Sequence, residues 1–185
     1  MSQIILEIDT DGEIDKIIQK LNTLPDRLKA PDTLRKAVNA AGRKVRKQMI
    51  SDAKGRYALK KAGAYNSESK IKTANVGDFG VEINAKGPMK AAKEFPMQGG
   101  AAGVTMKVLR ASGMKAVRVN GNKGFLAFGG NAYARKGSSR LPLEKIMSPG
   151  VPVMMGQPEV VEPAIETAHG LLEAEIEKQI AKILG

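Results

Sequence analysis

His169 is the only histidine in the chain, and there is no cysteine. Zinc and similar metals need several His or Cys ligands at fixed spacing, and no acidic cluster has the spacing of a calcium or magnesium site. A serine hydrolase needs a histidine beside a G-x-S-x-G motif, and that motif is absent. We therefore expect no catalytic residue, no metal and no cofactor, and we interpret His169 as a surface or packing residue on a helix.

The glycine-rich sequence GNKG at residues 121–124 is the nearest approach to a phosphate-binding loop. A P-loop has an earlier glycine and ends in Lys-Ser or Lys-Thr, and both features are missing here. In many enzymes a pair of carboxylates acts as general acid and base, but the spacing of Asp and Glu in this sequence indicates no such pair. An enzyme is therefore the least favoured class of function.

Basic residues offer a different chemistry, the binding of phosphate groups or acidic protein surfaces. The densest basic cluster fills four of five consecutive positions: Arg43, Lys44, Arg46 and Lys47. It is either a solvated helix face or a binding surface. Tyr57 and Tyr65 lie near basic residues at 56, 60 and 61, where they could stack on bases. The alternative is that both tyrosines cap the hydrophobic core.

The net charge of +11 is unevenly distributed along the 185 residues. Residues 1–30 carry four basic and six acidic side chains, and residues 156–185 carry two basic and six acidic ones. The body between them therefore has a net charge of +17. Such a body needs an acidic partner, which can be nucleic acid, another protein, or the acidic end of a second copy.

The N-terminal sequence has acidic residues where a signal peptide needs basic ones, and no stretch approaches the roughly 18 apolar residues of a membrane-spanning helix. We expect a protein without membrane contact that is made in a reducing compartment such as bacterial cytoplasm and stays there until it joins a partner.

Two helices are expected in the first third of the chain. Residues 1–30 form an N-terminal arm, in which 3–8 are a short strand or a lead-in and 12–24 are helical. A long basic helix follows over 31–56, with Pro31 at a first helical position. One apolar stripe should face the core: Leu34, Val38, Ala41, Val45 and Met49. Gly42 within this helix is there either for close packing or by simple tolerance.

The remaining chain is expected to contain short strands and one more helix. Residues 55–75 look irregular, whereas 76–156 form a Gly-rich β region with alternating apolar residues and glycine turns. Three prolines in 141–156 exclude regular helix there, so an extended arm is expected. A helix over 158–185, beginning at Pro158 or Pro163, should bury one stripe: Val161, Ile165, Ala168, Leu172, Ile176, Ile180 and Ile183.

These elements predict an α+β fold in which an antiparallel sheet packs against the long helix, with an amphipathic C-terminal helix and an extended proline-containing arm. At 185 residues, the chain is long enough for a single domain over 1–185. Aromatic residues make up only 4% of the chain, so the core should be aliphatic.

Four segments occur in an order that resembles the prophage minor tail protein Z family. They are KGPMKAAKEFPM at 86–97, GVTMKVLRAS at 103–112, KGFLAF at 123–128, and NAYARKGSSRLPLEKIMSPGVPVMM at 131–155. In that family a basic Gly-Val strand and a "G-A-F-I/V-A" strand precede an aromatic-x-R-x-G strand. An "R-x-P-I" segment then leads to "G-P-S-V-P". Here SPGVP stands in the last position, and the loop before Tyr133 is shorter.

The resemblance implies a structural virion protein that completes the head-proximal end of a phage tail and is needed for head–tail joining. It also implies a homo-oligomeric ring, expected to be a hexamer, with tail terminator, tail tube and head–tail connector proteins as partners. The protein would lie in the tail or neck of the virion. The alternative function is that of a basic DNA-contacting protein at the neck.

The segment PLEKIMSPGVPVMM is the best candidate for an arm that binds such partners, because it is apolar, proline-stiffened and rich in adaptable methionines. An equally open alternative is a strap that closes the protein's own sheet. The residues of this predicted interface are Arg140, Leu141, Pro142, Leu143, Ile146, Met147, Val151 and Pro152.

Overall fold

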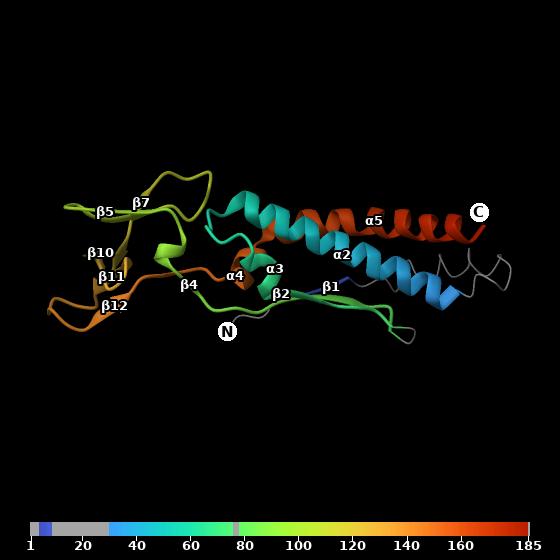
Figure 1. The fold of residues 1–185 in the computed structure, drawn as a ribbon, viewed down its shortest axis with the longest axis horizontal. Helices are drawn as coiled ribbons and strands as arrows, with labels where there is room; N and C mark the ends of the chain where they lie inside the picture. The colour runs from blue at the N-terminus through green and yellow to red at the C-terminus, as the bar shows by residue number, and fades with distance from the viewer. Residues whose placement is uncertain (1–3, 9–29, 76–77, 185) are drawn as a thin grey trace.

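A computed structural model describes residues 4–8, 30–75 and 78–184. The predicted helix at 12–24 lies outside the described residues. The molecule is elongated, with two long helices side by side over one half and short strands gathered at the other end (Figure 1). The helices are α2, Ala30–Arg56, and α5, Pro158–Leu184.

The predicted α2 stripe is confirmed, because all five of its apolar side chains are at most 4% exposed. Beside α2 lies a sheet with the strand order β1-β3-β2 (Figure 1). Its antiparallel strands are β1 (Ile4–Ile8), β2 (Ser69–Lys72) and β3 (Val81–Ala85). Alternate residues of the central strand β3 are buried, as a strand with one face on a core requires.

Gly42 settles how closely α2 approaches this sheet. A Cβ atom added at this position would lie 2.5 Å from Cγ1 of Val81 and 3.3 Å from its Cβ. Both distances leave no room for a methyl group, so the glycine serves close packing rather than being merely tolerated.

The C-terminal helix begins at Pro158 and passes through Pro163. Its buried stripe differs from the predicted one in the first turns, where Val160 and Ala164 are buried while Ile165 is 45% exposed. From Ala168 onward the predicted Leu172 and Ile176 are buried as well. The buried residues of α5 are spaced four residues apart, from Val160 to Ile176. Residues with this spacing form a ridge that is inclined to the helix axis, and such a ridge packs into a groove of a neighbouring helix, here α2.

The remaining strands form four further small sheets rather than the one sheet that we predicted. One sheet contains β5 (Met97–Gly100), β6 (Gly103–Met106) and β7 (Lys115–Ala116), and another contains β10 (Phe125–Ala127), β11 (Asn131–Arg135) and β12 (Leu143–Lys145). The other two sheets are pairs: β8 (Arg118–Val119) with β9 (Asn122–Lys123), and β4 (Lys90–Ala91) with β13 (Met147–Ser148). The α+β class is nevertheless confirmed.

Two segments expected to be irregular have regular structure. Residues 55–75 contain a short helix, α3 (Ala64–Glu68), followed by β2. Within 141–156, residues Val151–Met155 form a helix, α4. The prediction was wrong there because Pro152 occupies the first turn, where a missing backbone N–H costs no hydrogen bond. A 3-10 turn, η2 (Ala92–Glu94), links β4 to β5.

The core runs from the helices into the strand-rich end. Its fully buried side chains include Met49 of α2, Val104 of β6 and Met154 of α4. Phe95, which follows η2, is buried with them. An ion pair between the buried Lys90 of β4 and the half-buried Glu68 of α3 holds the segment before the strand-rich end against the helical half. The short strands are therefore anchored to the helical half and do not form a detached tail.

We expect Gly42→Ala to destabilise the protein by about 1–3 kcal/mol, because the new methyl group must displace the stiff Val81 side chain. The matched control is Gly55→Ala in the same helix, where nothing lies within 4 Å of the added Cβ. That change should be neutral or stabilising by up to about 1 kcal/mol. Urea unfolding of both variants measures the difference, and equal effects would contradict the close-packing argument.

Candidate functional site

The strand-rich end, residues 97–145, is hereafter the β lobe; it carries nine lysines and arginines and only one acidic residue, Glu144. Eight of these nine basic side chains are exposed, Lys107 being the exception. Within the described part of the chain, none of them takes part in an ion pair. The β lobe therefore presents a concentrated positive field that the protein itself does not neutralise.

The sheet β10-β11-β12 has one face on the core and one face toward solvent. Ala132 and Ala134 of the central strand are at most 1% exposed and point inward. Residues between them point outward, because side chains alternate along a strand. Tyr133 lies directly opposite Phe125 on one side and Lys145 on the other, so the three side chains form one row across the outer face.

Phe128 extends this row. It lies in the turn between β10 and β11 with a positive φ of 42°, and 72% of its surface is exposed. Its ring meets the Tyr133 ring edge-to-face at a centroid distance of 5.4 Å. Arg135, also on the outer face, is exposed opposite half-buried Leu143. We name this surface the aromatic face; its residues are Phe125, Phe128, Tyr133, Arg135 and Lys145.

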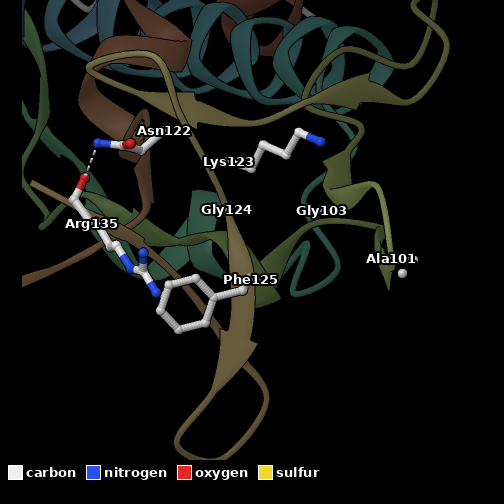
Figure 2. Close-up of a pocket in the computed structure, with 8 residues that line it drawn as sticks. Ala101, Gly103, Asn122, Lys123, Gly124, Phe125 and Arg135 are labelled. Carbon is white, nitrogen blue, oxygen red and sulfur yellow. Dashed lines mark hydrogen bonds between the residues drawn. The ribbon is translucent and has the colours of Figure 1, made fainter. Parts of the chain in front are cut away.

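A pocket of about 310 Å³ opens at one edge of the aromatic face (Figure 2). Phe125 and Arg135 extend toward the same side in the close-up, and Lys123 points away from them. The side-chain amide of Asn122 donates hydrogen bonds to the carbonyls of Arg135 and Gly137, at 3.0 and 3.1 Å. This fixes the base of the pocket. Glycines supply the remaining wall: Gly100, Gly103 and Gly124.

The four residues of the predicted basic cluster on α2 have different environments: two bind other parts of the fold, and two are exposed to solvent. Lys44 forms an ion pair of 2.5 Å with Glu175 of α5. The guanidinium of Arg46 donates hydrogen bonds to the carbonyls of Asn66 and Ser69, at 2.9 and 2.8 Å. Arg43 and Lys47 are exposed. Two of the four cations thus hold the fold together, and the cluster is not a uniform binding surface.

The predicted interface segment is likewise divided. Arg140, Leu141 and Pro142 are exposed in the loop before β12, and Met147 is 38% exposed. In contrast, Ile146, Val151 and Pro152 are buried in the protein's own core, so their surfaces are not available to a partner. The segment pairs through β12 with β11 and through β13 with β4. Most of it is therefore the strap that was the alternative interpretation.

The two tyrosines proposed as base-stacking residues are core residues. Tyr57 is 6% exposed and Tyr65 is 1% exposed. The Tyr65 hydroxyl lies 3.2 Å from Sδ of Met154, and burial raises the pKa of Tyr65 to about 12. The aromatic residues that reach solvent are instead those of the aromatic face, the exposed Phe128 and the half-buried Phe125 and Tyr133. Their signal in the sequence is the spacing of Phe125, Phe128 and Tyr133 among basic residues, a pattern that by itself indicates only apolar strands.

His169 is exposed on α5. Among the residues that the structure describes, no group of three or more His, Asp or Glu side chains is placed to hold a metal ion. Over the same residues, no helix has the length and apolar character to cross a membrane. No family model matches the chain, and no curated protein or solved structure is significantly similar to it.

Glu175 provides a pH-dependent test of the Lys44 pair. Its side chain is 4% exposed, and the hydrogen bond from Lys44 lowers the pKa of Glu175 below its usual 4.5, against the opposing effect of burial. A lowered pKa in the folded state stabilises the protein at neutral pH, and this contribution is lost as the pH falls below about 4.5 toward the lowered value.

We therefore expect Glu175→Gln to cost about 1 kcal/mol at pH 7, discounted for the exposed lysine partner, and clearly less at pH 3. Urea unfolding at both pH values measures this. The control is Glu173→Gln, an exposed residue of the same helix, which should change stability by less than about 0.5 kcal/mol at either pH. A Glu175→Gln effect of equal size at both pH values would refute the role of the charged pair.

Proposed function

We propose that this chain is a structural component of a phage virion, a tail-completion or neck subunit that acts by assembly at the head-proximal end of the tail. Two lines support the proposal: the ordered resemblance of residues 86–155 to the minor tail protein Z family, and the distribution of charge over the folded subunit. The second is the observation that carries it.

The exposed face of α5 is an acidic stripe. Its members are four exposed glutamates: Glu162, Glu166, Glu173 and Glu177. Steps of four, seven and four residues place them on one side of the helix. The stripe runs along α5 away from the β lobe, so the elongated subunit has an acidic surface and a basic surface in different places (Figure 1).

Two unlike, complementary surfaces are what a head-to-tail contact between identical subunits requires, and such a contact generates a closed ring when the rotation closes. We propose that the β lobe of one copy lies against the α5 stripe of the next. A hexamer is the ring that the family resemblance favours.

Exposed apolar side chains near the β lobe provide contacts for the other proposed partners, the tail terminator, tail tube and head–tail connector proteins. Leu141 is 68% exposed beside Arg140, and Met147 is 38% exposed. The virion is accordingly the proposed location of the assembled protein.

The charge pattern predicts a rescue experiment. Glu166→Lys with Glu173→Lys should abolish self-association, and so should Lys136→Glu with Arg140→Glu, because each pair of changes places like charges across the contact. A mixture of the two double variants should associate again in alternating order, because the unchanged lobe of one variant meets the unchanged stripe of the other and the new glutamates meet the new lysines. Sedimentation velocity at low and high salt measures the assembly, and unchanged self-association in both double variants would argue against the proposed ring contact.

The biological role is tested by deleting the gene from the phage or prophage genome that carries it. We expect electron micrographs of the lysate to show tails and filled heads that are not joined, and wild-type protein supplied in trans to restore complete particles. The α5 double variant, if folded, should fail to restore them. Complete, infectious particles without the protein would refute the proposed function.

A further inference from the structure

Three of the seven aromatic side chains of the protein lie together on the aromatic face, outside the core. The other four are the buried Tyr57, Tyr65 and Phe95 and the half-buried Phe79. A chain with so few aromatic residues thus places nearly half of them where water reaches them. Burial of the aliphatic core does not need this arrangement, so it points to a partner with flat apolar groups.

The charged side chains around the aromatic face indicate the sign of the charge on that partner. Arg135 and Lys145 belong to the face, and Lys136, which follows Arg135 in the chain, is exposed. Glu144, the one acidic residue of the β lobe, is exposed, but it lies opposite Ala134 and therefore leaves β12 on the other side of the sheet from Lys145. The partner is therefore anionic as well as flat.

We propose that the aromatic face binds single-stranded nucleic acid, whose bases stack on Phe125, Phe128 and Tyr133 while its phosphates lie against the surrounding cations. Aromatic rings interleaved with basic side chains on an open sheet are the usual means of holding unpaired bases without reading their sequence. In a duplex the faces of the bases are covered by their neighbours, so a duplex offers the rings nothing to stack on.

The register of the strands fits this binding mode. Phe125 and Tyr133 are direct cross-strand neighbours, so their Cβ atoms are about 5 Å apart, and Lys145 continues the same row. Phe128 covers the end of the row at the turn. A strand laid across the sheet therefore meets aromatic rings and a cation in succession.

The pocket in Figure 2 provides the end of this track. One wall is the Phe125 ring with the Arg135 guanidinium beside it. Three glycines, Gly100, Gly103 and Gly124, are also among its lining residues, and the absence of side chains there lets a planar group approach the backbone closely. Its volume of about 310 Å³ is at the small end of the range for ligand pockets and suits one terminal base.

This inference does not rest on the proposed assembly function, and it is tested with purified full-length protein. Fluorescence anisotropy with labelled dT20 should show binding that weakens with salt, with a slope of log K against log salt of roughly −2 to −3 for three or four phosphate contacts. A dT20 strand should bind more tightly than a 20-base-pair duplex. Comparison with rU20 shows whether the protein distinguishes DNA from RNA. Binding of either single strand more tightly than the duplex supports the proposal.

The decisive variants are Phe128→Ala and Tyr133→Leu, each of which should weaken dT20 binding by roughly 5- to 100-fold. The matched control is Leu126→Ala, which removes an exposed side chain of the same hairpin whose Cδ1 lies over Gly99. The control should bind as the wild type does. Far-UV circular dichroism establishes that each variant is folded, and Phe128 is exposed enough to be replaced without disturbing the core.

Three results would overturn the inference. One is the absence of dT20 binding at low salt. Another is duplex binding as tight as single-strand binding with both aromatic variants unchanged, which would show phosphate contacts alone. The third is displacement of dT20 by a 20-residue polyglutamate peptide at equal concentration, which would identify the face as a site for acidic protein. The first two results do not depend on whether the subunits form a ring, whereas the third would agree with the proposed contact between the β lobe and the acidic stripe of α5.

Discussion

The close contact between α2 and the strand β3 is the constraint on which the rest of the structure depends. Gly42 lets the helix backbone approach Val81 so closely that no side chain fits between them. The apolar stripe of α2 then fills the space under the β1-β3-β2 sheet, while α5 packs along the same helix. Both long helices and the first sheet thus form one rigid unit, because a packed core tolerates no independent movement of its layers.

The β lobe is built on the end of that unit by different means. Its strands are only two to five residues long, and they belong to several small sheets that share one aliphatic core. Small sheets cannot cover one another completely, so they leave turns and one open face in solvent. This explains why the exposed apolar and aromatic side chains gather there, for example Leu126, Phe128 and Leu141.

Charge is organised by the same division. Where basic residues lie on α2, several are bound within the fold, as Lys44 is by Glu175 and Arg46 by the carbonyls of residues 66 and 69. The β lobe itself contains one acidic residue, Glu144, and none of its cations forms an ion pair within the described part of the chain. Part of the charge of the helical half therefore stabilises the fold, whereas the β lobe leaves its positive charge unneutralised.

The sequence alone determined the long helices, the α+β class and the positive body, because periodicity and charge are local properties of the chain. The buried stripe of α2 was predicted residue by residue. Only the tertiary structure decided that the strands form several sheets, that Pro152 begins a helix, and that Ile146 and Val151 belong to the core. It also decided that Tyr57 and Tyr65 are buried while Phe125, Phe128 and Tyr133 share an open face. Strand register and packing partners join residues far apart in the chain, and nothing in the local pattern of a segment records which distant segment will cover it.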